Sequence, residues 1–259
     1  MIYIKYLSGL QLDNEADKEF YKNAIHGFEL YHDIFGNCPK NVVDIGSHVG
    51  SLACHAIANG AKNVVAVEAS KRNFDNLVVN RGLVKSKYNR FCNISCYNKA
   101  IYSIAGKQID FYSFPFSTGQ GAIGYNTGLG TTEEIVETID LSQLIFLIKI
   151  NFNTFGVIDL LKIDIEGGEF DAFPMNDITR NFLKNVKFLD LELHSFNNHN
   201  YFNNDKFMEE HPDFRDSHDN NGMLKYIDFI KSCGFTDNIY VMPEKYGGWI
   251  KSKNYNFLK

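Results

Sequence analysis

The chain has 259 residues, of which 44% are hydrophobic, 14% aromatic and 22% charged. This hydrophobic share excludes an intrinsically disordered chain, and the length can bury one large core, so we expect a single domain over residues 1–259. The formal net charge of -5 gives no general attraction for nucleic acid or for an anionic membrane. Small-molecule or glycan partners are therefore favoured, and a nucleic-acid partner is not expected.

The sequence also carries signals about its compartment. No stretch reaches the roughly 18 apolar residues of a membrane span, since the longest candidate, residues 144–150, contains Lys149. The N-terminal segment lacks the long apolar region of a cleaved secretory signal. The 5 cysteines have no CxxC spacing, which fits a reducing compartment. We expect a cytoplasmic protein without membrane spans.

Apolar periodicity predicts helices and strands that alternate along the chain. In chain order, the expected helices are residues 15–35, 51–59, 71–81, 168–173 and 222–232, the third of them ending at Gly82. The expected strands are residues 42–45, 63–68, 94–101, 157–164, 186–193, 236–242 and 249–253. Three further segments are an N-terminal helical segment at about residues 1–38, a β-meander insertion at about 105–139 and a polar loop at about 195–221 that we expect to act as a lid.

Strands that read as continuous apolar runs, with helices between them, are typical of a parallel sheet covered on both faces. The sequence therefore predicts an α/β fold with a doubly wound sheet and a final antiparallel hairpin. Folds of this kind bind ligands outside the carboxyl ends of their strands, where the strand order reverses. The polar residues that follow these strands are the first candidates for a functional site.

The first group of such residues follows the strand at 42–45. Asp44 stands at its end, and Gly46 and Gly50 allow a tight turn before a helix begins at Ser51, so that helix amides face a ligand. Glu68 ends the next strand, where a carboxylate can accept hydrogen bonds from both hydroxyls of an adenosine ribose. Together these residues predict an adenosyl cofactor, although the turn alone is also compatible with a purely structural role.

The glycine spacing distinguishes among adenosyl cofactors. A dinucleotide fingerprint is GxGxxG, whereas Gly46 and Gly50 have three residues between them and no middle glycine. Asp44 is unfavourable beside a diphosphate but suits the cationic amino-acid end of S-adenosylmethionine, directly or through water. An NAD-dependent oxidoreductase is the weaker enzyme alternative, and a non-catalytic cofactor-binding protein with a structural or regulatory role is the other.

A second group of acids follows the two later strands. Asp164 ends the strand at 157–164, and alternation along the next strand places Asp190, Glu192 and His194 on one face. A histidine and carboxylate pair is a plausible general base for a hydroxyl proton. A divalent metal held by Asp164, Glu192 and His194 stays open as an alternative that we do not predict. For Glu169 we expect only a favourable contact with the dipole of the following helix.

Two motifs make the sequence similar to FkbM-type methyltransferases. They are residues 43–50 with Val67 and Glu68, and residues 161–169, a lysine-isoleucine-aspartate-x-glutamate-glycine-x-glutamate string with few competitors. The similarity covers about residues 40–195, and Ser47 and His48 stand where the family usually has alanine and asparagine. The resemblance implies methyl transfer from S-adenosylmethionine to hydroxyl oxygens, commonly of sugars or natural products. It also implies a Rossmann-like class I methyltransferase fold with seven strands, the last of them antiparallel.

With this resemblance, we expect O-methylation of a hydroxyl on a sugar, glycan or other small molecule. The residues expected to bind the cofactor are Asp44, Gly46, Ser47, His48, Gly50, Ser51, Glu68, Ala69, Asn98, Ala100 and Asp164, with Asn98 and Ala100 beside the adenine. The residues expected to act in catalysis are Asp164, Glu192 and His194. Methylation of a nucleic-acid base is disfavoured because the sequence has no Asn-Pro-Pro-Tyr or Asp-Pro-Pro-Tyr string.

Overall fold

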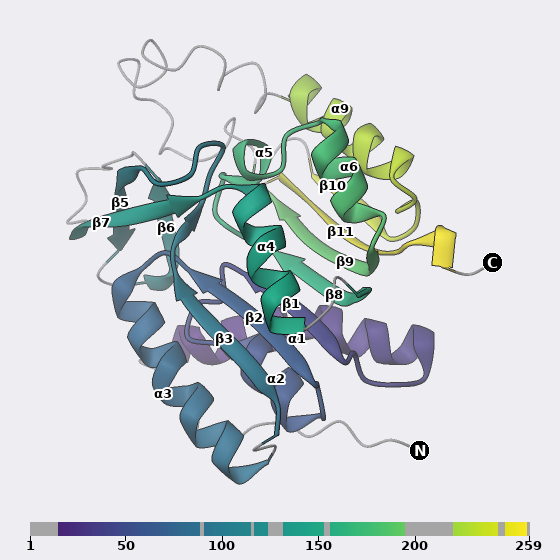
Figure 1. Cartoon of the computed structure of the whole chain (residues 1–259). Coiled ribbons are helices and arrows are strands. Elements are labelled where there is room, and N and C mark those ends of the chain that lie inside the picture. The colour runs from purple at the N-terminus through teal and green to yellow at the C-terminus, as the bar shows by residue number, and fades with distance from the viewer. Residues whose placement is uncertain are drawn as a thin grey trace.

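A computed structural model describes residues 15–88, 91–114, 117–123, 132–152, 156–194, 220–242 and 247–257 of the chain (Figure 1). Its helices are α1 (Glu15–Phe35), α2 (Ser51–Ala58), α3 (Lys71–Lys87), α4 (Leu141–Phe152), α5 (Glu169–Ala172), α6 (Asp177–Leu183), α9 (Asn220–Ser232) and the short 3-10 helix η3 (Tyr255–Phe257). Its strands are β1 (Asn41–Ile45), β2 (Asn63–Glu68), β3 (Asn93–Asn98), β4 (Ala100–Ile101), β5 (Gln108–Phe114), β6 (Ser117–Ile123), β7 (Thr132–Ile139), β8 (Ile158–Ile163), β9 (Val186–Leu193), β10 (Ile239–Met242) and β11 (Gly247–Lys253). The polar loop expected as a lid lies outside the described residues, apart from the start of α9.

The central sheet has seven strands in the order β10-β11-β9-β8-β1-β2-β3. Neighbours from β3 through β9 are parallel, whereas β11 runs antiparallel to both β9 and β10. The expected α/β fold with a terminal antiparallel hairpin is therefore confirmed. Along the chain, β1, β2 and β3 follow one another toward one edge of the sheet. The later strand β8 pairs with the other side of β1, so the strand order reverses between β1 and β8. That reversal is where such sheets bind ligands.

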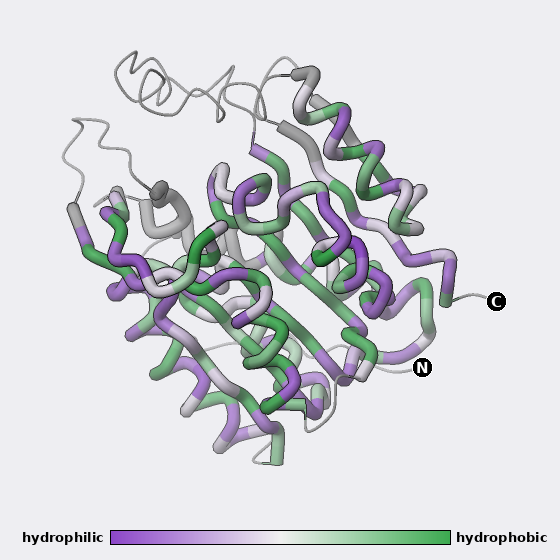
Figure 2. The backbone as a smooth tube through the Cα atoms, turned by 45° about the horizontal axis from the view of Figure 1, so that its top comes forward, coloured by the Kyte–Doolittle hydropathy of each residue, from purple (hydrophilic) through white to green (hydrophobic). Residues whose placement is uncertain are grey.

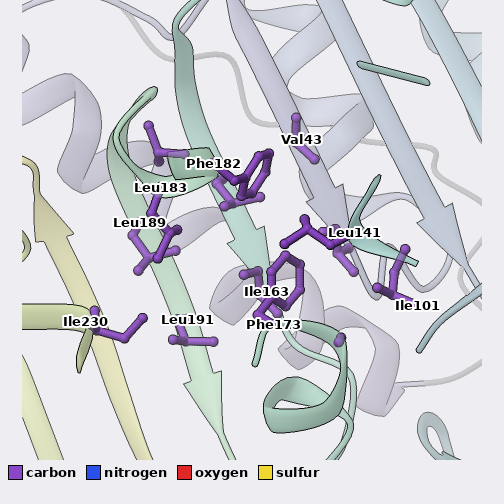
Figure 3. Packing of buried hydrophobic residues seen from close by; sticks show 14 of the residues in the cluster. Val43, Ile101, Leu141, Ile163, Phe173, Phe182, Leu183, Leu189, Leu191 and Ile230 are labelled. Carbon is purple, nitrogen blue, oxygen red and sulfur yellow. The ribbon is translucent and has the colours of Figure 1, made fainter. Parts of the chain in front are cut away.

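The strands are apolar on both faces because helices cover both. Val43, Val65 and Leu161 face a cluster built with residues of α4, α6 and α9. Their neighbours Val42 and Leu160 face a second cluster under α1, α2 and α3. Figure 1 shows α4 in front of the sheet and α1 behind it, and Figure 3 shows the packing of the first cluster. In Figure 2 the central strands are mostly hydrophobic, while the outer helix α9 alternates between the two colours.

Several expected boundaries are wrong. Helix α3 does not end at Gly82 but continues to Lys87, because Gly82 faces open space and Val84 beyond it is buried against the second cluster. The expected strand 94–101 is two strands, since it breaks at Lys99, whose amide donates to the Glu68 carbonyl over 3.1 Å. The last strand pair begins at Ile239 rather than at residue 236.

Two helices and one sheet arrangement were not anticipated. Helix α4 begins after Asp140, whose side chain accepts a hydrogen bond of 2.8 Å from the Gln143 amide, and α6 begins after Asn176, whose side chain caps Thr179. The expected β-meander is part of a second sheet with four strands in the order β4-β7-β5-β6. In the part of the chain that the structure describes, no helix has both the length and the apolar character to cross a membrane.

Two glycines provide a test of the helix assignments. A Cβ at Gly82 would meet nothing within 4 Å, so G82A should raise the free energy of unfolding by about 0.5–1 kcal/mol because alanine favours the helix interior. Gly50 has a φ of +88° and a Cβ there would lie 2.5 Å from Leu77 Cδ1, so G50A should lower the same quantity by roughly 1–3 kcal/mol. Urea denaturation of both variants measures this. Destabilisation by G82A would contradict a helix that passes through residue 82.

Candidate functional site

A cavity of about 740 Å³ lies at the carboxyl ends of β1, β2, β8 and β9. Its volume is within the range of small-molecule sites. Residues of β1, β2 and the turns after them line one end, and residues of β8, β9 and β11 line the other. Ala24, His26 and Leu30 of α1 and Phe111 of β5 also line it, together with residues of α3, β4 and β10. The cavity therefore occupies the point of strand-order reversal.

The turn after β1 is held close to the end of β8. Gly46 has a φ of +74°, and a Cβ at this position would lie 1.7 Å from the Asp164 carbonyl oxygen, so no other residue fits. The amides of Gly46 and Ser47 both donate to the Val67 carbonyl at 3.0 Å. The Ser47 hydroxyl donates to the Asp44 carbonyl at 2.7 Å. Three strands thus fix the backbone at this end of the cavity.

Asp44 and Ser51 carry buried polar atoms that face this end. The Oδ2 atom of Asp44 accepts a hydrogen bond of 3.2 Å from the Ala53 amide. Asp44 Oδ1 and Ser51 Oγ are buried and have no hydrogen-bond partner among the described residues. Burial raises the pKa of Asp44 to about 6, although the cation of Lys162 opposes this. Such atoms favour a polar, cationic ligand, which is the chemistry of the amino-acid end of S-adenosylmethionine.

The carboxylate of Glu68 joins the turns after β1 and β2. Its Oε2 accepts from the His48 amide at 2.8 Å, and its Oε1 accepts from the Ser70 amide at 2.9 Å. Burial raises its pKa to about 7, although these two bonds oppose the rise. Each carboxylate oxygen can accept a second hydrogen bond, so both remain available to ribose hydroxyls. The residues around Glu68 therefore fit an adenosyl group.

The second sheet is hydrogen-bonded to the turn after β2. Glu134 of β7 accepts hydrogen bonds from the Lys71 amide at 2.6 Å and from the Ser70 hydroxyl at 3.3 Å. Asn98 at the end of β3 donates to the carbonyls of Glu68 and Ala69 at 3.0 and 2.8 Å. The start of α3 is thus anchored from two sides. Sequence reasoning missed Glu134, because its distance along the chain from residue 70 hides the contact.

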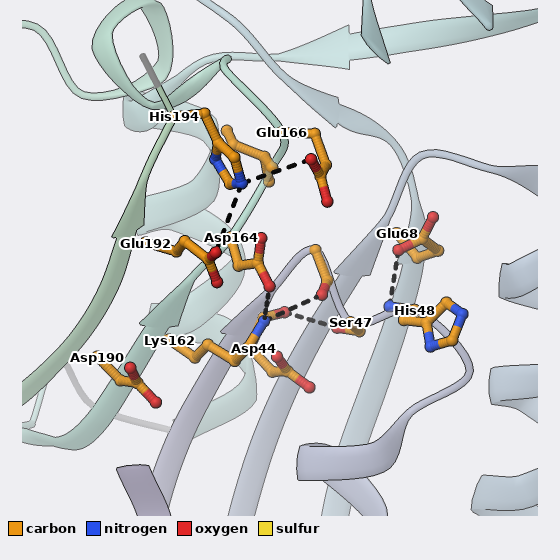
Figure 4. Close-up of polar contacts among 12 residues, drawn as sticks. Asp44, Ser47, His48, Glu68, Lys162, Asp164, Glu166, Asp190, Glu192 and His194 are labelled. Carbon is orange, nitrogen blue, oxygen red and sulfur yellow. Dashed lines mark hydrogen bonds and ion pairs between the residues drawn. The ribbon is translucent and has the colours of Figure 1, made fainter. Parts of the chain in front are cut away.

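Lys162 is a buried cation at the centre of the site (Figure 4). Its Nζ donates to Asp164 Oδ2 at 3.0 Å and to the Gly46 carbonyl at 3.5 Å. Burial alone would lower the pKa of Lys162, but Asp164 and Asp44 hold it above its usual value. Burial alone would raise the pKa of Asp164, but Lys162 and His194 together outweigh that effect, so the net shift is downward. Sequence reasoning missed Lys162, although a charged residue inside the apolar run of β8 was a usable signal.

His194 lies among three glutamates beyond the end of β9 (Figure 4). Its Nδ1 is 3.0 Å from Glu169 Oε1, and its Nε2 is 3.4 Å from Glu166 Oε2 and 3.7 Å from Glu192 Oε1. Burial would lower the pKa of His194, but Glu166 and Glu169 raise it well above its usual value. Burial raises the pKa of Glu166 to about 8, although His194 opposes this.

Glu169 has a larger part in this group than the helix-dipole contact that we expected. It is fully buried, and its carboxylate accepts hydrogen bonds from the amides of Ile165 and Gly167 as well as engaging His194. Glu169 therefore holds the turn after β8 and the ring of His194 in one arrangement. Glu166, at a φ of +54°, was not selected from the sequence because nothing in its spacing distinguishes it from a turn residue.

The structure brings most of the predicted site residues to the cavity. Those that line it are Asp44, Gly46, Ser47, His48, Ser51, Glu68, Ala69, Ala100, Asp164 and Glu192. The three that do not are Gly50, Asn98 and His194. Gly50 precedes α2 and packs against Leu77, Asn98 holds the Ala69 backbone, and His194 contacts Glu166 and Glu192. The binding and catalytic roles of all these residues stay predictions.

The strand order, the antiparallel β11 and the acidic ends of β1 and β2 define a Rossmann-like methyltransferase fold. The Methyltransferase FkbM domain family matches residues 44–236. This match covers more than half of the chain, so the protein belongs to the FkbM methyltransferase family.

Solved structures with a similar fold include three methyltransferases of low sequence identity. An FkbM methyltransferase from Methylobacillus flagellatus KT is 13% identical with a TM-score of 0.46, and the match covers 83% of this chain but only 43% of that one. Magnesium protoporphyrin IX methyltransferase from Synechocystis PCC 6803, solved with bound SAM, is 10% identical with a TM-score of 0.46 and coverages of 96% and 87%. The ribosomal protein L11 methylase from Lactobacillus delbrueckii subsp. bulgaricus is 12% identical with a TM-score of 0.39 and coverages of 97% and 85%. No curated protein matches the chain.

The buried carboxylate of Asp44 predicts a pH-dependent difference in stability. Its pKa is raised from 3.8 to about 6 in the folded protein, so the stability it contributes is present below pH 3.8 and is lost as the pH rises through 6. D44N has no such titration. Over this window the free energy of unfolding of D44N should rise relative to the unsubstituted protein, on the order of 1–3 kcal/mol. Urea denaturation at several pH values measures the difference, and a difference that does not vary with pH would contradict a buried ionising Asp44.

Proposed function

We propose that the protein is an S-adenosylmethionine-dependent O-methyltransferase that acts on a hydroxyl of a sugar, glycan or other small molecule. The observation that carries this proposal is that one cavity joins the Asp44 and Glu68 end of the sheet to the Asp164 and Glu192 end. A cofactor at the first end and an acceptor at the second end would share the space above β1 and β8. Family membership supports methyl transfer, and the residues at the two ends support the choice of cofactor and acceptor.

At the cofactor end, each polar group has a partner in S-adenosylmethionine. Asp44 Oδ1 and Ser51 Oγ are buried without a partner in the described chain and suit the amino-acid part. Glu68 suits the ribose hydroxyls, and Ala69 and Ala100 leave room for the adenine. When bound, the cofactor supplies a methyl group already activated on a sulfonium.

At the acceptor end, the lining is acidic and aromatic. Asp164, Glu166 and Glu192 line it together with Trp249, which stands opposite Glu192 in the β11 and β9 pair. Asp190 is neutralised by Lys251 at 2.9 Å. Carboxylates repel polyanions and accept hydrogen bonds from hydroxyls, so this end favours a neutral hydroxyl compound over a nucleic acid.

Catalysis would depend mainly on alignment, because the methyl group needs little activation beyond the sulfonium. Proton removal from the acceptor hydroxyl by Glu192, within the group of acids around His194, would assist the transfer. His194 would position Glu166 and Glu192 through its Nε2, and Glu169 would hold the ring through Nδ1. Lys162 would keep Asp164 ionised beside the reacting groups.

Binding of S-adenosylhomocysteine tests the cofactor assignment. We expect isothermal titration calorimetry to detect one site per chain and to detect no binding of NAD. D44N should weaken S-adenosylhomocysteine by about ten- to hundredfold, because a hydrogen bond to a charged group contributes about 1.5–3 kcal/mol.

The matched control is D177N, a carboxylate to amide change on a side chain that is 96% exposed in α6. D177N should bind S-adenosylhomocysteine like the unsubstituted protein. Binding of NAD without S-adenosylhomocysteine, or equal affinities in D44N and D177N, would overturn the cofactor assignment.

Product analysis tests the acceptor assignment. With labelled S-adenosylmethionine and a panel of sugars and other hydroxyl compounds, we expect the label in an ether methyl group. E192Q should lower kcat by about tenfold or more, in line with the usual contribution of a general base, while the affinity for S-adenosylhomocysteine changes less than about twofold. Label on nitrogen, carbon or RNA, or an unchanged kcat in E192Q, would contradict this part of the proposal.

A further inference from the structure

Three side chains at the acceptor end are close enough to share one metal ion. Asp164, Glu192 and His194 each offer a ligand atom, and these atoms all lie within 4.8 Å of one another. Ligand atoms about 2.0–2.2 Å from a tetrahedral ion lie about 3.4 Å apart, and opposite ligands of an octahedral ion about 4.2 Å apart. The separation of 3.7 Å between His194 Nε2 and Glu192 Oε1 falls between these values. The limit of 4.8 Å exceeds the separation of opposite octahedral ligands, so the three side chains would have to move closer together around an ion.

The orientation of His194 is the one that metal sites require. Its Nδ1 faces the fully buried Glu169 at 3.0 Å, which directs Nε2 toward Glu166 and Glu192 (Figure 4). A carboxylate that holds the far nitrogen of a metal-bound histidine is a recurring feature of such sites, because it fixes the ring and its tautomer. Glu169 comes from α5 and His194 from the end of β9, so two separate elements set this geometry.

The charges point to the same conclusion. Asp164, Glu166, Glu169 and Glu192 are four carboxylates, and within the described chain the cations that contact them are Lys162 and His194. Lys162 is directed at Asp164, so Glu166, Glu169 and Glu192 all share His194. Carboxylates that outnumber the cations beside them favour a bound divalent cation.

We propose that Asp164, Glu192 and His194 bind a divalent metal ion at the acceptor end of the cavity. Carboxylate ligands with one imidazole suit Mn²⁺ and similar ions. Three protein ligands leave positions open for water or for an acceptor oxygen. The role of the ion in holding an acceptor hydroxyl rests on the proposed function, whereas its binding does not.

The sequence provides a built-in reporter of this site. Trp249 is the single tryptophan of the chain, it lines the cavity, and it pairs with Glu192 across β9 and β11. Mn²⁺ quenches nearby tryptophan fluorescence, and its electron paramagnetic resonance signal reports the free ion. Titration of the full chain with Mn²⁺ alone should give one bound ion per chain and matching quenching of Trp249.

Substitution of the ligands decides the assignment. E192Q and H194Q should each weaken Mn²⁺ binding by at least tenfold while S-adenosylhomocysteine binding is retained. The matched control is H32Q, because His32 also lies beside a carboxylate, Asp33 at 3.6 Å, but does not belong to the group of three side chains whose ligand atoms lie together. H32Q should bind Mn²⁺ like the unsubstituted protein.

The outcomes separate this proposal from the proposed function. Absence of stoichiometric Mn²⁺ binding, or equal affinity in E192Q and H32Q, would overturn the metal site whatever the cofactor result. Mn²⁺ binding without S-adenosylhomocysteine binding would leave the metal site standing and reject the methyltransferase proposal. If H194Q loses its circular dichroism spectrum, E192Q decides alone, since its side chain is 35% exposed and is not part of the core.

Discussion

The ion pair of Lys162 is the contact on which the rest of the site depends. Its Nζ lies 3.0 Å from Asp164 Oδ2 and 3.5 Å from the Gly46 carbonyl, so one cation joins the end of β8 to the turn after β1. Without it, Asp44 and Asp164 would repel each other across a buried gap. Loss of one partner from a buried ion pair costs about 3–5 kcal/mol because the other charge is left uncompensated, so removal of the lysine alone would destabilise the fold as well as the site.

The buried carboxylates near Lys162 lower the stability of the folded chain when they are ionised. Burial raises the pKa of Asp44, Glu68 and Glu166, which means that each charge is costly in its surroundings. A cationic or hydroxyl-rich ligand relieves that cost and stabilises the folded chain by mass action. The fold thus places these carboxylates where they can bind a ligand. Gly46 permits the close approach between the turn after β1 and the backbone of Asp164 that this placement requires.

Much of the fold followed from the sequence because apolar runs and glycines are local signals. The strand 186–193 was predicted to the residue, and the turn at Gly46 was recognised from its spacing. The two ends of the cavity were also recognisable from the sequence, since Asp44, Glu68 and Asp164 each lie at or next to the end of a strand. Lys162, Glu166 and Glu134 were missed, because their contacts with Gly46, His194 and Ser70 join segments that are distant in sequence. The break at Lys99 was missed for a similar reason: β4 exists only because β7 pairs with it.

The hydrogen bonds from Ser70 and Lys71 to Glu134 join the second sheet to the start of α3, beside the carboxylate of Glu68. The carboxylate from β7 accepts a hydrogen bond from the first amide of α3, so β7 has a structural role at the start of that helix. Replacement of β7 by another sequence would leave the Lys71 amide without its acceptor unless the new sequence brought a carboxylate to the same place. The sequence of β7 is therefore constrained by the turn that it supports.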